Sequence, residues 1–335
     1  MWKFDEERYM KLGEETVQKR AEIEKIADDV SEKGYENIFF ISSGGSLAIM
    51  VPYEKAIKKL SKKPVFMEIA GEVVLTGNEQ LSEKSLVITA SKSGDTKETV
   101  RAIKYCKERN ITVVSFVGIL ESSLARLSDY VIHDHSPEVE HTYLNLNYFI
   151  FKLLANQGEF SRYQEFADQL ELLPNALLEA KKQFDPVAEK IAKAHAKDDY
   201  QIWVGGGTIW GDIYLFSMCV LEEMQWIRTK SVTSSEFFHG TLEIVEEGVP
   251  VFLVKGEDET RPLDERVEKF INDFTDQGVI IDTKDFPLTG IDEEFRKYCS
   301  PAVVEAILTE RLAVQFERRT GHDLNFRRYY RQFDY

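Results

Sequence analysis

Short apolar runs alternate with amphipathic segments along the first third of the chain. The runs contain five or six residues each, and segments between them, such as Thr96–Glu108, carry apolar residues at helical spacing. Strands that alternate with helices are typical of right-handed βαβ units and a parallel sheet. The pattern therefore predicts strands over Asn37–Ser42, Val65–Ile69, Ser85–Thr89 and Thr112–Val117.

The same alternation starts again near residue 200. Before the first strand, residues 5–33 place apolar positions at helical intervals among many charges, which predicts one amphipathic helix capped by Gly34. The stretch His141–Ala194 is rich in leucine and helical in period. Beyond it the sequence predicts a helix from about Gly211 to Arg228 and three strands, Tyr200–Val204, Val249–Val254 and Gly278–Ile281.

Two similar α/β domains account for this organisation. With 335 residues the chain has room for two domains of about 130–150 residues. Each is expected to hold a parallel sheet between two layers of helices, a three-layer αβα arrangement. The expected parts are an N-terminal helix over 1–34, a first domain over 35–155, a helical connector over 156–195, a second domain over 196–315 and a C-terminal tail over 316–335.

The net charge of the chain limits the classes of partner that it is expected to bind. A formal net charge of -16 argues against nucleic acid and anionic lipid as partners, because both require a basic face. No stretch reaches the 18 or more apolar residues of a membrane span, and the start does not resemble a secretory signal. Three unclustered cysteines, Cys106, Cys219 and Cys299, suit a reducing compartment. We therefore expect a cytoplasmic protein that binds neither nucleic acid nor membrane.

Two loops of the first half offer hydroxyl groups at strand ends. The first strand runs into Gly44, Gly45 and Ser46, and the third runs into Ser91, Lys92, Ser93 and, three residues later, Thr96. Open α/β sheets bind ligands at this edge, and a helix N-terminus attracts phosphate. Plain turn and helix-capping roles are the alternatives. Neither nucleotide fingerprint, G-x-x-x-x-G-K-[ST] or G-x-G-x-x-G, is matched here, and no cofactor is expected.

The second half contains a possible acid–base pair. Glu223 is flanked by apolar and aromatic residues in the segment Glu222–Trp226, and His239 follows sixteen residues later. A buried carboxylate can act as a general base and a histidine can exchange a proton near neutral pH. The alternatives are an exposed helix residue for Glu223 and a structural role for His239.

Taken together, these segments resemble the double sugar-isomerase (SIS) domain family. The resemblance rests on S-G-G-S, S-K-S-G-D-T, E-E-M-Q-W and S-S-E-F-F-H-G-T-L-E-I-V, and it covers nearly all of the chain after the first helix. Within the family, three segments are most similar to bacterial fructosamine-6-phosphate deglycases: the run Glu243–Arg261, D-E-T-R-P-L-D-E-R at Asp258–Arg266, and the ending from Arg327 to Tyr335.

The resemblance implies a role for each candidate residue. Ser46, Ser91, Ser93 and Thr96 match the phosphate-binding hydroxyl positions, Glu223 matches the catalytic base, and His239 matches a histidine supplied by a neighbouring subunit. A homodimer or larger assembly is therefore expected. The tail, with Arg328 and Tyr329, resembles a segment that closes over the active site.

The chain also departs from the family pattern. Thr241 stands where the family usually has proline, and Lys92 stands where the family's synthase has glutamine, which adds a cation beside the phosphate loop. No lysine lies in the tail, where that synthase carries its Schiff-base lysine. The group of His133, Asp134, His135 and His141 is interpreted as structural, and no metal is expected.

The expected reaction is hydrolysis of a phosphorylated sugar–amino acid conjugate. The leading hypothesis is a deglycase that converts a fructosamine 6-phosphate, such as fructoselysine 6-phosphate, to glucose 6-phosphate and a free amino acid by Glu/His acid–base catalysis. One alternative is a glucosamine-6-phosphate deaminase or isomerase, or a deglycase for the C2-linked glucoselysine 6-phosphate. Another alternative is a non-catalytic sugar-phosphate-sensing module.

Overall fold

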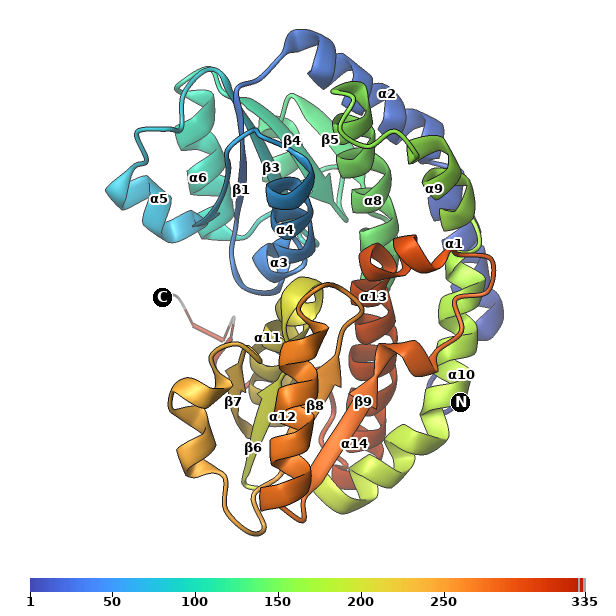
Figure 1. Cartoon of the computed structure of the whole chain (residues 1–335). Coiled ribbons are helices and arrows are strands. Elements are labelled where there is room, and N and C mark those ends of the chain that lie inside the picture. Colours follow the sequence, from blue (N-terminus) through green and yellow to red (C-terminus); the bar gives the residue numbers. More distant parts are fainter. Residues whose placement is uncertain (331, 334–335) are drawn as a thin grey trace. The chain divides into compact units, whose positions relative to one another are not determined.

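In the computed structural model, which describes residues 1–330 and 332–333, the chain forms two units, each with its own parallel sheet (Figure 1). The first unit is Arg8–Pro174. The second unit combines Met1–Glu7 with the chain from Asn175 onward. The predicted α/β class with two parallel sheets is confirmed.

The first unit is a three-layer sandwich. Its strands lie in the order β2-β1-β3-β4-β5, and all neighbours are parallel. One face of the sheet packs on α5, α6 and α7 through Phe39, Val87 and Val113, while Phe116 on the opposite face contacts Phe149 of α8. The elements are α1 (Glu6–Val17), α2 (Arg20–Lys33), β1 (Asn37–Ser42), α3 (Gly44–Ala48), α4 (Val51–Leu60), β2 (Val65–Ile69), α5 (Ala70–Thr76), β3 (Ser85–Ser91), α6 (Lys97–Lys107), β4 (Thr112–Val117), α7 (Ser123–Leu127), β5 (Tyr130–His133), α8 (Val139–Asn156) and α9 (Tyr163–Leu170).

The second unit repeats this plan with four strands in the order β7-β6-β8-β9, again all parallel. Ile202 and Leu253 pack with Val267 of α12, whereas Trp203 contacts Phe216 on the opposite face. The elements are α10 (Leu173–His195), β6 (Tyr200–Val204), η1 (Gly207–Ile209), α11 (Trp210–Leu215), the π-helical η2 (Phe216–Gln225), β7 (Arg228–Val232), η3 (Phe237–His239), η4 (Thr241–Ile244), β8 (Val251–Lys255), α12 (Arg261–Phe274), β9 (Gly278–Asp282), η5 (Thr283–Asp285), α13 (Glu293–Ile307), the π-helical η6 (Leu308–Leu312) and α14 (Ala313–Thr320).

Each sheet has a switch point where the strand order reverses. In the first sheet the chain turns one way from β1 to β2 and the other way at β3, so the point lies between β1 and β3. In the second sheet it lies between β6 and β8. Ligands of open α/β sheets bind outside the carboxyl ends of such strands. The loops that follow β1, β3, β6 and β8 are therefore the positions to inspect.

Two helix predictions need correction. The single helix expected over 5–33 is two helices, α1 and α2, interrupted at Gln18 and Lys19. The Lys19 ammonium donates to the carbonyl of His133 at 2.5 Å, a tertiary contact that no local pattern reports. The helix expected to reach Arg228 ends at Gln225, because Trp226 adopts a left-handed conformation with φ 58°.

Two edge strands lack the longer apolar run from which the other strands were predicted. β5 has four residues, and β7 reads Arg-Thr-Lys-Ser-Val with no apolar run. An edge strand pairs on one side only, so it needs less apolar surface than a central strand. Among the described helices, none is long and apolar enough to cross a membrane.

Candidate functional site

The switch point of the first sheet is lined by the two predicted hydroxyl loops. Gly44 begins α3 with φ +56°, and a Cβ built on it would meet no atom within 4 Å. The Ser42 hydroxyl donates to the carbonyl of Ala90 at 2.8 Å and so joins the ends of β1 and β3. Ser46 is half-buried on α3, which packs against β3. Small residues thus leave open space at this crevice.

The loop after β3 is organised by its own hydroxyl groups. Ser91 is buried, accepts a hydrogen bond from the Gly94 N–H at 3.0 Å and lies 3.3 Å from the Thr96 hydroxyl. The Ser93 hydroxyl accepts from the Asp95 N–H at 3.3 Å. Thr96 precedes α6 but makes no capping hydrogen bond with its side chain among the described residues. The first N–H groups of α6 and these hydroxyls are groups that favour a phosphate.

Lys92 lies in this loop, but its ammonium is directed to other partners. It donates to Asp134 Oδ2 at 2.5 Å, to the carbonyl of Ser136 at 2.7 Å and to the Thr142 hydroxyl at 3.1 Å. An ammonium has only three N–H donors. Asp134 is buried and also accepts from Asn145 at 3.1 Å, so Lys92 ties the loop to the end of β5 and the start of α8.

The corresponding crevice of the second sheet is filled by the chain itself. Gly207 has φ +59°, and a Cβ on it would lie 2.0 Å from Asp258 Oδ2 and 2.3 Å from the Thr260 hydroxyl. The Asp258 carboxylate accepts from the Thr208 N–H, and from the Thr260 N–H at 2.8 Å. A carboxylate of the chain therefore occupies the turn where an external anion would bind.

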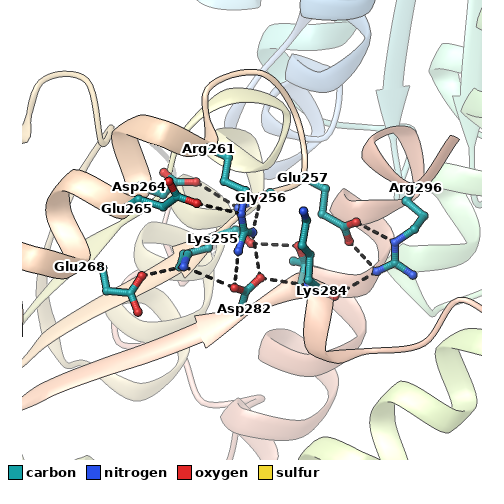
Figure 2. Close-up of polar contacts among 11 residues, drawn as sticks. Lys255, Gly256, Glu257, Arg261, Asp264, Glu265, Glu268, Asp282, Lys284 and Arg296 are labelled. Atoms are coloured by element: carbon teal, nitrogen blue, oxygen red, sulfur yellow. Dashed lines mark hydrogen bonds and ion pairs between the residues drawn. The ribbon is translucent and has the colours of Figure 1, made fainter. Parts of the chain in front are cut away.

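Ion pairs lie at the ends of β8 and β9, next to the loop that carries Asp258 (Figure 2). Arg261 donates to both oxygens of Asp282, at 2.9 and 2.5 Å, and to the carbonyl of Gly256 at 2.9 Å. Arg296 grips Glu257 through two bonds of 2.6 and 2.7 Å. Two-point arginine–carboxylate pairs restrict geometry more than single contacts do, so the Gly256–Thr260 loop is fixed.

Glu223 lies near the end of the π-helical segment η2 in the second unit. Its side chain is 27% exposed, so it is half-buried rather than fully shielded. Its Oε1 accepts from Arg327 Nε at 2.6 Å. Among the described residues, Oε2 has no hydrogen-bond partner, and no hydrogen bond joins Glu223 to His239. One carboxylate oxygen is thus held, while the other is available as far as the described residues are concerned.

The residues beside Glu223 form a platform for the C-terminal segment. We call this surface the tail platform and define it as Glu223, Gln225 and Trp226. Gln225 Nε2 donates to the carbonyl of His322 at 2.9 Å. The Trp226 ring lies 4.3 Å from the His322 ring and 4.1 Å from the Arg328 guanidinium. Tyr329, in contrast, is 64% exposed.

His239 lies at the end of a short loop that is anchored in the core. Phe237 is buried and packs edge-on against Phe238 and Phe270, at 5.2 and 5.4 Å between ring centroids. His239 itself is exposed, and Gly240 follows with φ +146°, a conformation that side chains rarely adopt. The loop therefore presents the imidazole to solvent in the isolated chain.

A buried carboxylate supports the start of that loop. Asp264 accepts from the Ser234 hydroxyl through Oδ1 and from the Gly256 N–H at 3.1 Å through Oδ2. Burial raises the pKa of Asp264 to about 6, although both hydrogen bonds oppose the shift. The same residue thus joins the His239 loop to the loop after β8.

The histidines near the end of β5 have protein partners. His133 Nε2 lies 3.3 Å from the carbonyl of Gly118, His135 lies 3.1 Å from Glu15, and His141 Nδ1 lies 2.8 Å from the Ser136 hydroxyl. Burial lowers the pKa of His135. These contacts give the histidines structural work in the first unit.

The known proteins that this chain resembles support its two-sheet fold. Residues 33–157 match the SIS domain model. The chain is 31% identical over 332 residues to fructosamine deglycase FrlB of Bacillus subtilis, an alignment that spans 97% of this chain and all of the relative. The chain belongs to the SIS-domain family. The resemblance predicted from the motifs is confirmed.

Two further relatives of this SIS-domain protein extend the match. Fructoselysine 6-phosphate deglycase of Escherichia coli is 22% identical over 261 residues, which cover 78% of this chain and 77% of the relative. A crystal structure from Bacillus subtilis, classed as a phosphosugar isomerase, superposes with a TM-score of 0.90 at 30% identity, covering 96% of this chain and 99% of that one. The relatives named here are therefore two deglycases and a structure classed as a phosphosugar isomerase.

Sequence reasoning missed two residues that the structure brings to these places. Arg327, which was not among the predicted site residues, contacts Glu223, and Asp258 closes the second crevice. Arg327 is 104 residues from its partner, and adjacent arginines in the tail give no local signal that separates them. The approach of Asp258 to the Gly207 turn is a tertiary contact, which is visible only in the folded chain.

The closed crevice predicts that Gly207→Ala costs more stability than a comparable glycine change. The control is Gly248→Ala, at φ +84° with no atom within 4 Å of the new Cβ. Both variants pay about 1–2 kcal/mol for a left-handed alanine, but only Gly207→Ala displaces the Asp258 carboxylate, at a further cost of about 1–3 kcal/mol. Urea unfolding followed by tryptophan fluorescence reports the second unit, because all four tryptophans lie there. Equal losses in the two variants would contradict this account.

The contacts of Lys92 predict a structural role. Lys92→Met should lower the unfolding free energy of the first unit by about 1–3 kcal/mol, because buried Asp134 loses its ionic partner. The control is Lys84→Met, which breaks an exposed pair with Glu36 and should cost about 0–1 kcal/mol. Calorimetric unfolding measures both. A Lys92→Met variant as stable as the control would show that the ammonium is not a tether.

Asp264 predicts a pH dependence of stability. Since its folded pKa is raised to about 6, the folded state holds an extra proton between about pH 4 and pH 6, and stability falls as the pH rises through that window. The stability of the wild type relative to Asp264→Asn should therefore drop by about 1–3 kcal/mol from pH 4 to pH 7. Exposed Asp273→Asn is the control. A difference that does not vary with pH would refute the assignment.

Proposed function

We propose that this SIS-domain protein is a deglycase that hydrolyses a fructosamine 6-phosphate to glucose 6-phosphate and a free amino acid. The observation that carries the proposal is the carboxylate of Glu223, with Oε1 held by Arg327 and Oε2 without a partner among the described residues. The match to fructosamine deglycase FrlB along the whole of that relative supports the choice of substrate. Free cysteines suit the proposed cytoplasmic setting.

The phosphate of this substrate is assigned to the first unit. Ser46, Ser91, Ser93 and Thr96 supply hydroxyls, and α6 supplies N–H groups. Gly44 and Gly45 allow a close approach of the backbone. Arg328 and Tyr329 are proposed to contact the rest of the substrate from the tail. Lys92 contributes by holding the loop rather than by reaching the phosphate.

Glu223 is assigned the carbon-proton transfer. In the open-chain ketosamine it removes a proton from C1, which gives an enaminol, and a proton is then returned to C2. The resulting imine at C1 accepts water, and the C1–N bond breaks to release the amine and leave the aldehyde of glucose 6-phosphate. Each assisted proton transfer contributes about 100- to 10,000-fold to the rate.

His239 is assigned the ring-opening proton transfer. Its exposed position on a core-anchored loop suits a residue supplied to a second copy of the chain. The active assembly is therefore proposed to be a homodimer or larger. A module that only binds its ligand requires neither a general base nor a proton-transferring histidine. The presence of both Glu223 and His239 therefore favours an enzyme over a ligand-sensing module.

Glu223→Gln should lower the rate of glucose 6-phosphate release by about 100-fold or more, because the amide cannot accept the proton from carbon. Phosphosugar binding, measured by calorimetry, should persist, since the hydroxyl loops are unchanged. The assay couples glucose 6-phosphate to its dehydrogenase and uses fructoselysine 6-phosphate as substrate.

The substrate panel separates the alternatives. Turnover of glucosamine 6-phosphate or of a C2-linked conjugate in preference to fructoselysine 6-phosphate would replace the proposed substrate. Binding without turnover of any of them would favour a sensing module. An active Glu223→Gln enzyme would refute the assigned base.

A further inference from the structure

The geometry points to Arg327 as the positioning residue of Glu223. We infer that it fixes one oxygen of the carboxylate so that the other faces the carbon acid in a single orientation. The inference rests on the proposed function and goes beyond it, because the proposal requires only that Glu223 be a base.

The two side chains are joined by one hydrogen bond rather than by two. Arg327 Nε donates to Glu223 Oε1 at 2.6 Å, and among the described residues no guanidinium nitrogen reaches Oε2. A two-point pair of the usual arginine–carboxylate kind would occupy both oxygens. The observed geometry therefore restrains rotation of the carboxylate and, within the described part of the chain, leaves Oε2 as an acceptor for the substrate proton.

The guanidinium is itself fixed by its own segment. Arg327 Nη1 donates to the carbonyls of Leu324 and Phe326, at 2.6 and 2.9 Å. Its side chain is 17% exposed. Donors that point in three set directions belong to a planar fork, which a lysine ammonium cannot imitate. The docked tail therefore sets the orientation of the Glu223 carboxylate through Arg327.

The tail has independent anchors on the same platform. His322 contacts Gln225 and Trp226, and Arg328 covers the Trp226 ring. These contacts do not involve Arg327, so the tail can remain docked when Arg327 is replaced. Trp226 fluorescence reports that docking directly, with a Trp226→Phe spectrum subtracted to isolate the signal.

The test compares Arg327→Met with Arg319→Met on the deglycase substrate. Arg319 forms an exposed pair with Glu189 at 3.0 Å and provides the matched loss of an arginine–carboxylate contact. Arg327→Met should lower kcat about 10- to 100-fold, because a misplaced reacting group costs rates of that order, and should leave KM within about threefold. Arg327→Lys should remain closer to Arg327→Met than to the wild type, and added methylguanidinium should restore part of the kcat of Arg327→Ala. Arg319→Met should match the wild type.

Three results would overturn the inference. An unchanged kcat in Arg327→Met would show that Glu223 needs no restraint. A rise confined to KM would make Arg327 a substrate ligand instead. A fall in kcat accompanied by loss of the Trp226 signal would mean that Arg327 acts by holding the tail. A wild type that turns over no conjugate would sink the proposed function itself, which is a different outcome from all three.

Discussion

Parallel strand pairing around a switch point determines where ligands can approach an open α/β sheet, and both sheets of this chain have such a point. In both units the central strands end side by side, and the first of them, β1 or β6, runs into a turn of small residues. Open space remains at Gly44, while the Asp258 carboxylate fills the space at Gly207. The turn is therefore open at Gly44 in one unit, whereas Asp258 and Thr260 close it at Gly207 in the other.

In the second unit the proposed base, Glu223, lies near a helix end instead. The π-helical segment η2 ends at Gln225, two residues after Glu223, because Trp226 is left-handed. Such irregular turns are frequent at functional sites, where the backbone accepts strain to place a side chain. Here the residues that end the helix have a second role. Gln225 and Trp226 also contact the tail, and the tail in turn contacts Glu223 through Arg327.

Much of the fold was accessible from the sequence, and less of the site. Central strands such as Asn37–Ser42 and Tyr200–Val204 were predicted with the observed bounds, because strands buried on both faces are continuous apolar runs. The edge strand β7 and the early end of η2 were not, since pairing on one side and a left-handed tryptophan leave no apolar signature.

The site residues divide in the same way. Ser91 and Thr96 are close in sequence and proved close in space, as local motifs usually are. The partner of Glu223 lies 104 residues away and the destination of the Lys92 ammonium 42 away, so only the folded chain identifies them. Motifs show which residue types are present, whereas tertiary contacts decide which of those side chains remain available.

Carbon-proton transfer before hydrolysis is the central claim, and solvent isotope tests it most directly. The wild-type enzyme would convert fructoselysine 6-phosphate in D₂O, and the glucose 6-phosphate formed would be examined by NMR and mass spectrometry. The account predicts deuterium at C2, because the proton added to the enaminol passes through an exchangeable carboxyl group. Glucose 6-phosphate formed at full rate with no deuterium at C2 would contradict it.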